Sequence, residues 1–138
     1  MDFKNLFLSF QGRTRRSHFW IGLVILWVIQ TVIWSFTVGG AMSAAAARGQ
    51  PGDIAGAFSG VGLIGMIVLI ALIWPSLAIQ VKRWHDRDKS GWMVLIMLIP
   101  LVGAIWVLVE CGFLEGTPGP NKYGPSPKGL GAPTAATV

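Results

Sequence analysis

Residues 19–47 read FWIGLVILWVIQTVIWSFTVGGAMSAAAA, which is 29 consecutive positions without an acidic or basic side chain. Two further charge-free stretches follow, with 28 residues at 54–81 and 20 residues at 90–109. An α-helix rises 1.5 Å per residue and needs about 20 apolar residues to cross the hydrocarbon of a bilayer. The sequence therefore predicts an all-α membrane protein with three transmembrane helices, over about 19–38, 58–81 and 92–114.

The composition agrees with a membrane location. Of the 138 residues, 53% are hydrophobic and only 12% are charged, whereas soluble domains average about 25% charged residues. So few charges cannot solvate the whole surface of a domain of this size, and a water-soluble fold is excluded. The length fits one domain, and we assign residues 1–128 to a single transmembrane domain.

The lysines and arginines are distributed unevenly between the predicted loops. Eight of them precede the first span or lie between the second and third: Lys4, Arg13, Arg15, Arg16, Lys82, Arg83, Arg87 and Lys89. The other three are Arg48, Lys122 and Lys128. Because cytoplasmic loops carry the excess of Lys and Arg, the N-terminus is predicted to be cytoplasmic. Three crossings would then put the C-terminus in the periplasm.

Short segments flank the predicted spans. Phe3, Leu6, Phe7 and Phe10 repeat at the spacing of one helical face, which predicts a short amphipathic helix. This helix would lie in the membrane interface or pack on the cytoplasmic ends of the spans. Residues 115–138 hold five Gly and five Pro, which predicts an extended, turn-rich tail. Its last residues, 129–138, are predicted to be disordered.

The densest polar cluster is KRWHDRDKSG at residues 82–91. Basic residues complement the dipole at the end of the second helix, and Asp88 or Ser90 can cap the next one. Membrane anchoring by a basic loop does not require the carboxylate of Asp86, so we expect this carboxylate to pair with a cation. We predict a cytoplasmic clasp in which Asp86 pairs with the Arg13/Arg16 segment. The candidate cluster consists of Arg13, Arg16, Arg83, His85, Asp86 and Ser90.

No recognisable catalytic motif accompanies this cluster. Neighbouring residues on a helix do not face each other, so His85 and Asp86 would form a dyad only in a bent loop. A metal site needs three or four ligands, and the chain has two histidines and one cysteine. Nucleic-acid binding would need a basic folded surface with base-reading side chains. The sequence therefore predicts no catalytic, cofactor or metal site and no nucleic-acid partner.

Three separated motifs carry a family resemblance: FQGRTRRSHFW at 10–20, RWHD with SGW and a proline at 83–100, and GTPGPNKYGPSP at 116–127. Together they resemble the small bacterial inner-membrane proteins of domain-of-unknown-function family 805. The resemblance implies membership and an inner-membrane location, and it supplies no established activity. It also adds a tail motif to the candidate residues: Asn121, Tyr123, Gly124 and Pro125.

Three functions follow from these features as hypotheses. The first is a structural or accessory protein that packs beside a membrane-protein partner or a second copy, with anionic lipid headgroups at its cytoplasmic face. The second is an oligomeric transporter or pore component, which would use Gln30, Glu110 and proline kinks at Pro75 and Pro100. The third is an enzyme acting on a lipid headgroup at the Arg/His/Asp cluster.

Overall fold

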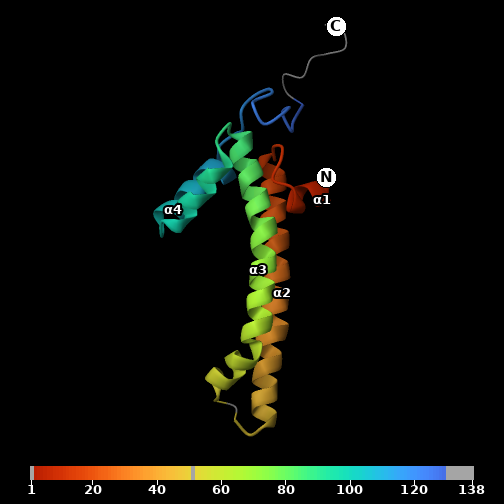
Figure 1. The fold of residues 1–138 in the computed structure, drawn as a ribbon, viewed down its shortest axis with the longest axis vertical. Helices are drawn as coiled ribbons and strands as arrows, with labels where there is room; N and C mark the ends of the chain where they lie inside the picture. Colours follow the sequence, from red (N-terminus) through yellow and green to blue (C-terminus); the bar gives the residue numbers. More distant parts are fainter. Residues whose placement is uncertain (1, 51, 130–138) are drawn as a thin grey trace. The chain divides into compact units, whose positions relative to one another are not determined.

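The computed structural model describes residues 2–50 and 52–129. All regular elements in these ranges are helical, apart from one isolated bridge between Asn121 and Gly124 (Figure 1). They are α1 (Phe3–Leu8), α2 (Arg16–Ala47), α3 (Ile54–Asp86), the 3₁₀-helix η1 (Gly91–Leu98), α4 (Val102–Val107) and the π-helix η2 (Leu108–Phe113). The predicted helical fold class is confirmed. Of the residues predicted to be disordered, 129–138, all but the first lie outside the described residues.

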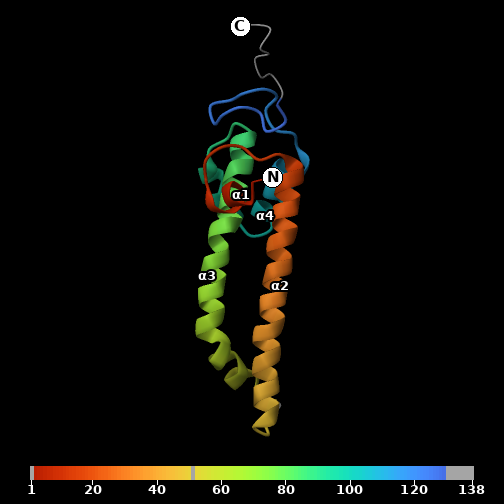
Figure 2. The same ribbon diagram turned by 90° about the vertical axis from the view of Figure 1, so that its right-hand side faces the viewer.

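The chain divides into two compact units, and the first comprises Val24–Trp74. In this unit α2 and α3 run antiparallel and are joined by the loop at 48–53 (Figure 2). Both helices are long and apolar enough to cross a membrane. Large apolar side chains point outward along them, and Trp27 and Phe36 are 68% and 79% exposed. Such a surface suits lipid and not water.

The first long helix extends further than predicted. The sequence predicted a span ending near residue 38, whereas α2 continues to Ala47. Alanine has the highest helix propensity of all residues, so the run at 44–47 prolongs the helix instead of breaking it.

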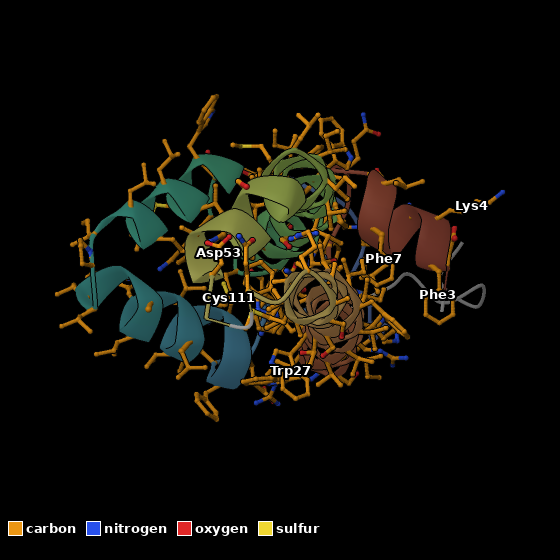
Figure 3. All side chains as sticks on the ribbon, turned by 90° about the horizontal axis from the view of Figure 1, so that it is seen from below. Phe3, Lys4, Phe7, Trp27, Asp53 and Cys111 are labelled. Carbon is orange, nitrogen blue, oxygen red and sulfur yellow. The ribbon has the colours of Figure 1, made fainter. Side chains whose placement is uncertain are left out.

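The second unit comprises Met1–Leu23 and Pro75–Val138. It begins with α1, where the side chain of Asp2 accepts a hydrogen bond from the Asn5 amide at 3.2 Å. The Phe3 and Phe7 rings stack on one side of α1, and Lys4 projects from another (Figure 3). At the end of α1, the Lys82 ammonium from α3 donates to the Leu6 carbonyl at 2.8 Å. The predicted N-terminal helix is therefore held against the end of α3.

The prediction of one continuous third span over 92–114 is wrong. In its place η1 and α4 pack against each other as a hairpin, which leaves the end of α3 and returns to it (Figure 1). The eight residues of η1 cover about 16 Å at the 3₁₀ rise. The twelve residues of α4 and η2 cover about 18 Å. Neither leg is as long as the ~30 Å hydrocarbon core is thick.

The reversal has a local cause at Pro100 and Leu101. Leu101 adopts φ 60° and ψ −59°, and the amide of Val102 donates to the Pro100 carbonyl at 2.7 Å. This is a γ-turn of the rare, strained kind. Gly103 then allows the two legs to touch, because a Cβ atom there would overlap the Ile96 carbonyl oxygen. Leu98 and Leu101 at the tip are 79% and 80% exposed, so the tip is apolar.

Because the chain turns back, the segment that follows η2 lies beside the loop that precedes η1. Arg87 donates to the Glu115 carbonyl, and the Thr117 amide donates to the Asp86 carbonyl at 2.7 Å. The tail therefore lies beside residues 82–91, from which the sequence predicted that a third crossing would separate it.

Gly103→Ala is expected to destabilise the hairpin. The added methyl group must push apart two backbones in contact, an overpacking cost of about 1–3 kcal/mol, although alanine favours helix by up to about 1 kcal/mol. We expect a lower midpoint of thermal unfolding in mild detergent. Gly40→Ala in α2 is the matched control, because nothing lies within 4 Å of its added Cβ. Equal midpoints for the two variants would contradict the close contact of the legs.

Candidate functional site

The candidate residues gather around the last turn of α3. The final carbonyl groups of a helix have no partners within the helix, and other segments must supply donors. Here the Thr14 amide donates to the Lys82 carbonyl at 3.3 Å, and the Asn121 side chain donates to the His85 carbonyl at 2.9 Å. The N-terminal segment and the tail are thus positioned by the unsatisfied end of one helix.

A buried ion cluster, Arg13 with Arg83 and Asp86, lies at the centre of this region. The Asp86 side chain is 4% exposed and accepts from Arg13 at 2.9 Å through one oxygen and from Arg83 through the other. The side chains of Arg13 and Arg83 are 1% and 0% exposed. Hydrogen bonds between charged groups are stronger than those between neutral groups. Because all three side chains are buried, removing one of them would leave an uncompensated charge away from water.

Arg13 also holds the tail. Its two terminal nitrogens donate to the Thr117 and Gly119 carbonyls, each at 2.6 Å. The planar guanidinium can reach a carboxylate and two carbonyls at once, which an ammonium group cannot do. Gly116 lies so close to Asp86 that a Cβ atom there would overlap the carboxylate. Gly116, in the predicted tail segment, therefore has a packing role.

Arg83 holds the returning end of the hairpin. Its Nε donates to the Cys111 carbonyl at 2.6 Å, and a terminal nitrogen donates to the Leu114 carbonyl at 2.5 Å. The remaining nitrogen reaches the Thr14 carbonyl at 3.2 Å. A cation is favourable at the last carbonyls of a helix such as η2, where the helix dipole is negative.

A more exposed set of ion pairs surrounds the cluster. The predicted clasp allowed Arg16 to pair with Asp86. In the structure Arg16 pairs instead with Glu115 at 2.6 Å. Glu110 pairs with Arg87 at 3.0 Å and with Lys89 at 2.8 Å. Sequence reasoning missed the Glu110 pairs because a straight third span would carry this carboxylate away from the loop. The turn residues Pro100 and Gly103 were the signal for the return.

His85 takes no part in the ion cluster. Its Nδ1 lies 3.2 Å from the Gly12 carbonyl, and its ring stacks on the Tyr123 ring with centroids 3.9 Å apart. The tail motif fixes this stack, because the Asn121 side chain accepts from the Tyr123 amide at 2.9 Å. The hydrogen bonds found for His85 and Asp86 do not connect the two side chains, so the structure offers no His–Asp dyad.

The other predicted residues have separate positions. Ser90 accepts from the Trp92 amide at 3.3 Å and caps η1, so of the two predicted caps, Asp88 and Ser90, the structure uses Ser90. Gly124 exchanges backbone hydrogen bonds with Asn121, at φ 133°, a conformation that favours glycine. Pro125 follows this turn and is exposed.

Two cavities border the end of α3. One has a volume of about 300 Å³ and is lined by Arg13, Asp86 and several polar tail residues. The other has a volume of about 360 Å³, and its lining includes His85, Ser90 and Tyr123. Over residues 2–50 and 52–129, no three His, Cys, Asp or Glu side chains are grouped to hold a metal ion.

Comparison of the sequence with known proteins places the chain in a family. The chain is similar to "Inner membrane protein YhaH" of Escherichia coli strain K12, with 32% identity over 123 residues, 88% of this chain and 89% of the relative. "Inner membrane protein YhaI" of the same strain is 29% identical over 125 residues, 88% of each chain. No solved structure matches. The family model described as "Protein of unknown function (DUF805)" matches residues 7–125. The chain therefore belongs to the DUF805 family, whose members include these inner-membrane proteins.

Proposed function

We propose that this protein is an inner-membrane accessory or interaction protein whose buried ion cluster serves architecture and not a reaction. One observation carries the proposal: every guanidinium nitrogen of Arg13 and Arg83 donates to an acceptor of the chain itself. A catalytic group must be free to reach a substrate. These two cations are instead used to fasten the N-terminal segment, the hairpin and the tail to α3.

We further propose two spans, formed by α2 and α3, and a hairpin that enters the membrane from the cytoplasmic face and returns. In this topology both ends of the chain are cytoplasmic. Ten of the eleven Lys and Arg residues then lie on the cytoplasmic side, and only Arg48 lies outside. This distribution follows the positive-inside rule more closely than three crossings do. The apolar, exposed tip of the hairpin supports its insertion.

The geometry favours neither of the other two hypotheses. A lipid-headgroup enzyme at this cluster would need His85 and Asp86 at one ligand, whereas they line different cavities. A pore role for Glu110 would need a free carboxylate within the bilayer, whereas Arg87 and Lys89 pair with it. The surface left for a partner is the apolar face of the helices and hairpin, which a second copy or another membrane protein can cover.

Native mass spectrometry tests the accessory role. The protein would be crosslinked in intact membranes, extracted in mild detergent and weighed as an intact complex. We expect a defined complex with a second copy or with another membrane protein. A bare monomer, with crosslinks scattered over abundant neighbours, would contradict the proposal.

A further inference from the structure

The larger cavity has an apolar part and a polar part that follow each other along α3. Leu77, Val81 and His85 all line it. Because they are four residues apart, they share one face of the helix, about 6 Å apart along its axis. Leu77 and Val81 belong to the charge-free stretch, and His85 lies beyond it. The cavity therefore runs from the level of the hydrocarbon towards the polar surface.

The walls of the cavity repeat this gradient. Val94 and Trp92 from η1 line it, and Trp92 is 78% exposed, so the cavity reaches the molecular surface. Ser90 and Tyr123, two residues that carry hydroxyl groups, also line it. Cavities of about 300–1,000 Å³ with apolar walls and a few polar groups are typical of small-molecule sites.

Positive charge lies next to the polar part. The Lys122 ammonium lies 5.2 Å from the centroid of the Tyr123 ring. Lys122 is exposed, and among the residues that the structure describes it forms no ion pair. It differs in this from the arginines of the ion cluster, because each of their guanidinium nitrogens donates a hydrogen bond within the chain. A basic group at the cytoplasmic surface of a membrane attracts anionic lipid.

We infer that this cavity binds one anionic phospholipid. Part of an acyl chain lies along Leu77, Val81 and Val94, and the phosphate lies near the Tyr123 hydroxyl and the Lys122 ammonium. The inference rests on the proposed function in one respect, the placement of the end of α3 at the cytoplasmic surface. It adds a specific site to the general attraction of lipid by the basic loops.

Lipid competition followed by native mass spectrometry tests this site. The full-length protein would be purified in mild detergent containing equal amounts of phosphatidylglycerol and phosphatidylcholine. We expect one retained phosphatidylglycerol per chain. Lys122→Gln is expected to lower the preference for phosphatidylglycerol about fivefold, the equivalent of one cation's attraction for anionic lipid. Val94→Trp fills the apolar part and is expected to abolish retention of both lipids.

Two matched variants serve as controls. Lys128→Gln removes an exposed cation that lines the other cavity, and Val102→Trp adds the same ring at the hairpin tip. Both are expected to retain lipid as the unmodified protein does. Retention by Val94→Trp, or an equal preference change for Lys122→Gln and Lys128→Gln, would overturn the site. Lipid retention and protein–protein association give different masses, so failure of this site is distinguishable from failure of the accessory role.

Discussion

Asp86→Asn is expected to lower the midpoint of thermal unfolding in mild detergent far more than Lys89→Gln. The substitution leaves Arg13 and Arg83 buried without their shared negative charge. Removing one partner of a buried ion pair costs about 3–5 kcal/mol, because the remaining charge is uncompensated. Here two cations lose their partner at once, and the amide of asparagine restores no charge.

Lys89→Gln is the matched control for this experiment. Lys89 is 35% exposed, and Glu110 keeps its second partner Arg87 when Lys89 is neutralised. Exposed ion pairs contribute at most about 1 kcal/mol. If both variants shift the midpoint equally, Asp86 does not hold the assembly together.

Arg13→Lys is expected to release the tail although the positive charge is kept. Lysine cannot reach Asp86 and the Thr117 and Gly119 carbonyls together, so partly buried acceptors lose their donors. Each unsatisfied buried group costs about 1–3 kcal/mol, and we expect a total loss of about 2–4 kcal/mol. The direct measurement is the rate of trypsin cleavage after Lys122, which should rise as the tail detaches.

The control for this variant is Arg48→Lys. Arg48 is exposed in the loop between α2 and α3, and its replacement should change neither the unfolding midpoint nor the cleavage rate. A tail in Arg13→Lys that is cleaved no faster than in the unmodified protein would show that Arg13 does not hold it.

The helices α2 and α3 follow directly from the sequence. Each comes from a charge-free run that is long enough to cross a bilayer. Within lipid such a run forms a helix, because a helix satisfies all its backbone hydrogen bonds internally. The third run has the same composition, and its length of 20 residues passes the same test. What differs is one γ-turn at Leu101 and one close contact at Gly103. Both depend on conformation and packing, which hydropathy does not report, so the sequence predicted a kink where the chain reverses.

The candidate site, like the fold, was predictable only in part. The negative charge of Asp86 in a basic loop pointed to an arginine partner from the Arg13/Arg16 segment. The structure brings Arg13 to it, and Arg83 of the same helix as well. The pairs of Arg16 and Glu110 were not predictable, because they exist only once the hairpin has returned. The composition of the tail motif predicted turns. It did not predict that the tail packs on α3, because the acceptor there is the His85 backbone carbonyl, a group that every residue type carries.

Site-directed labelling from the periplasmic side tests most directly whether the hairpin returns both chain ends to one face. Single cysteines would be introduced at Ser17, Gln50 and Ser126 and exposed to a membrane-impermeant maleimide; the native Cys111 is fully buried. We expect the cysteine at position 50 to react in intact spheroplasts, and those at 17 and 126 to react only after lysis. Reaction at position 126 in intact spheroplasts, with position 17 protected, would establish a third crossing and contradict the re-entrant hairpin.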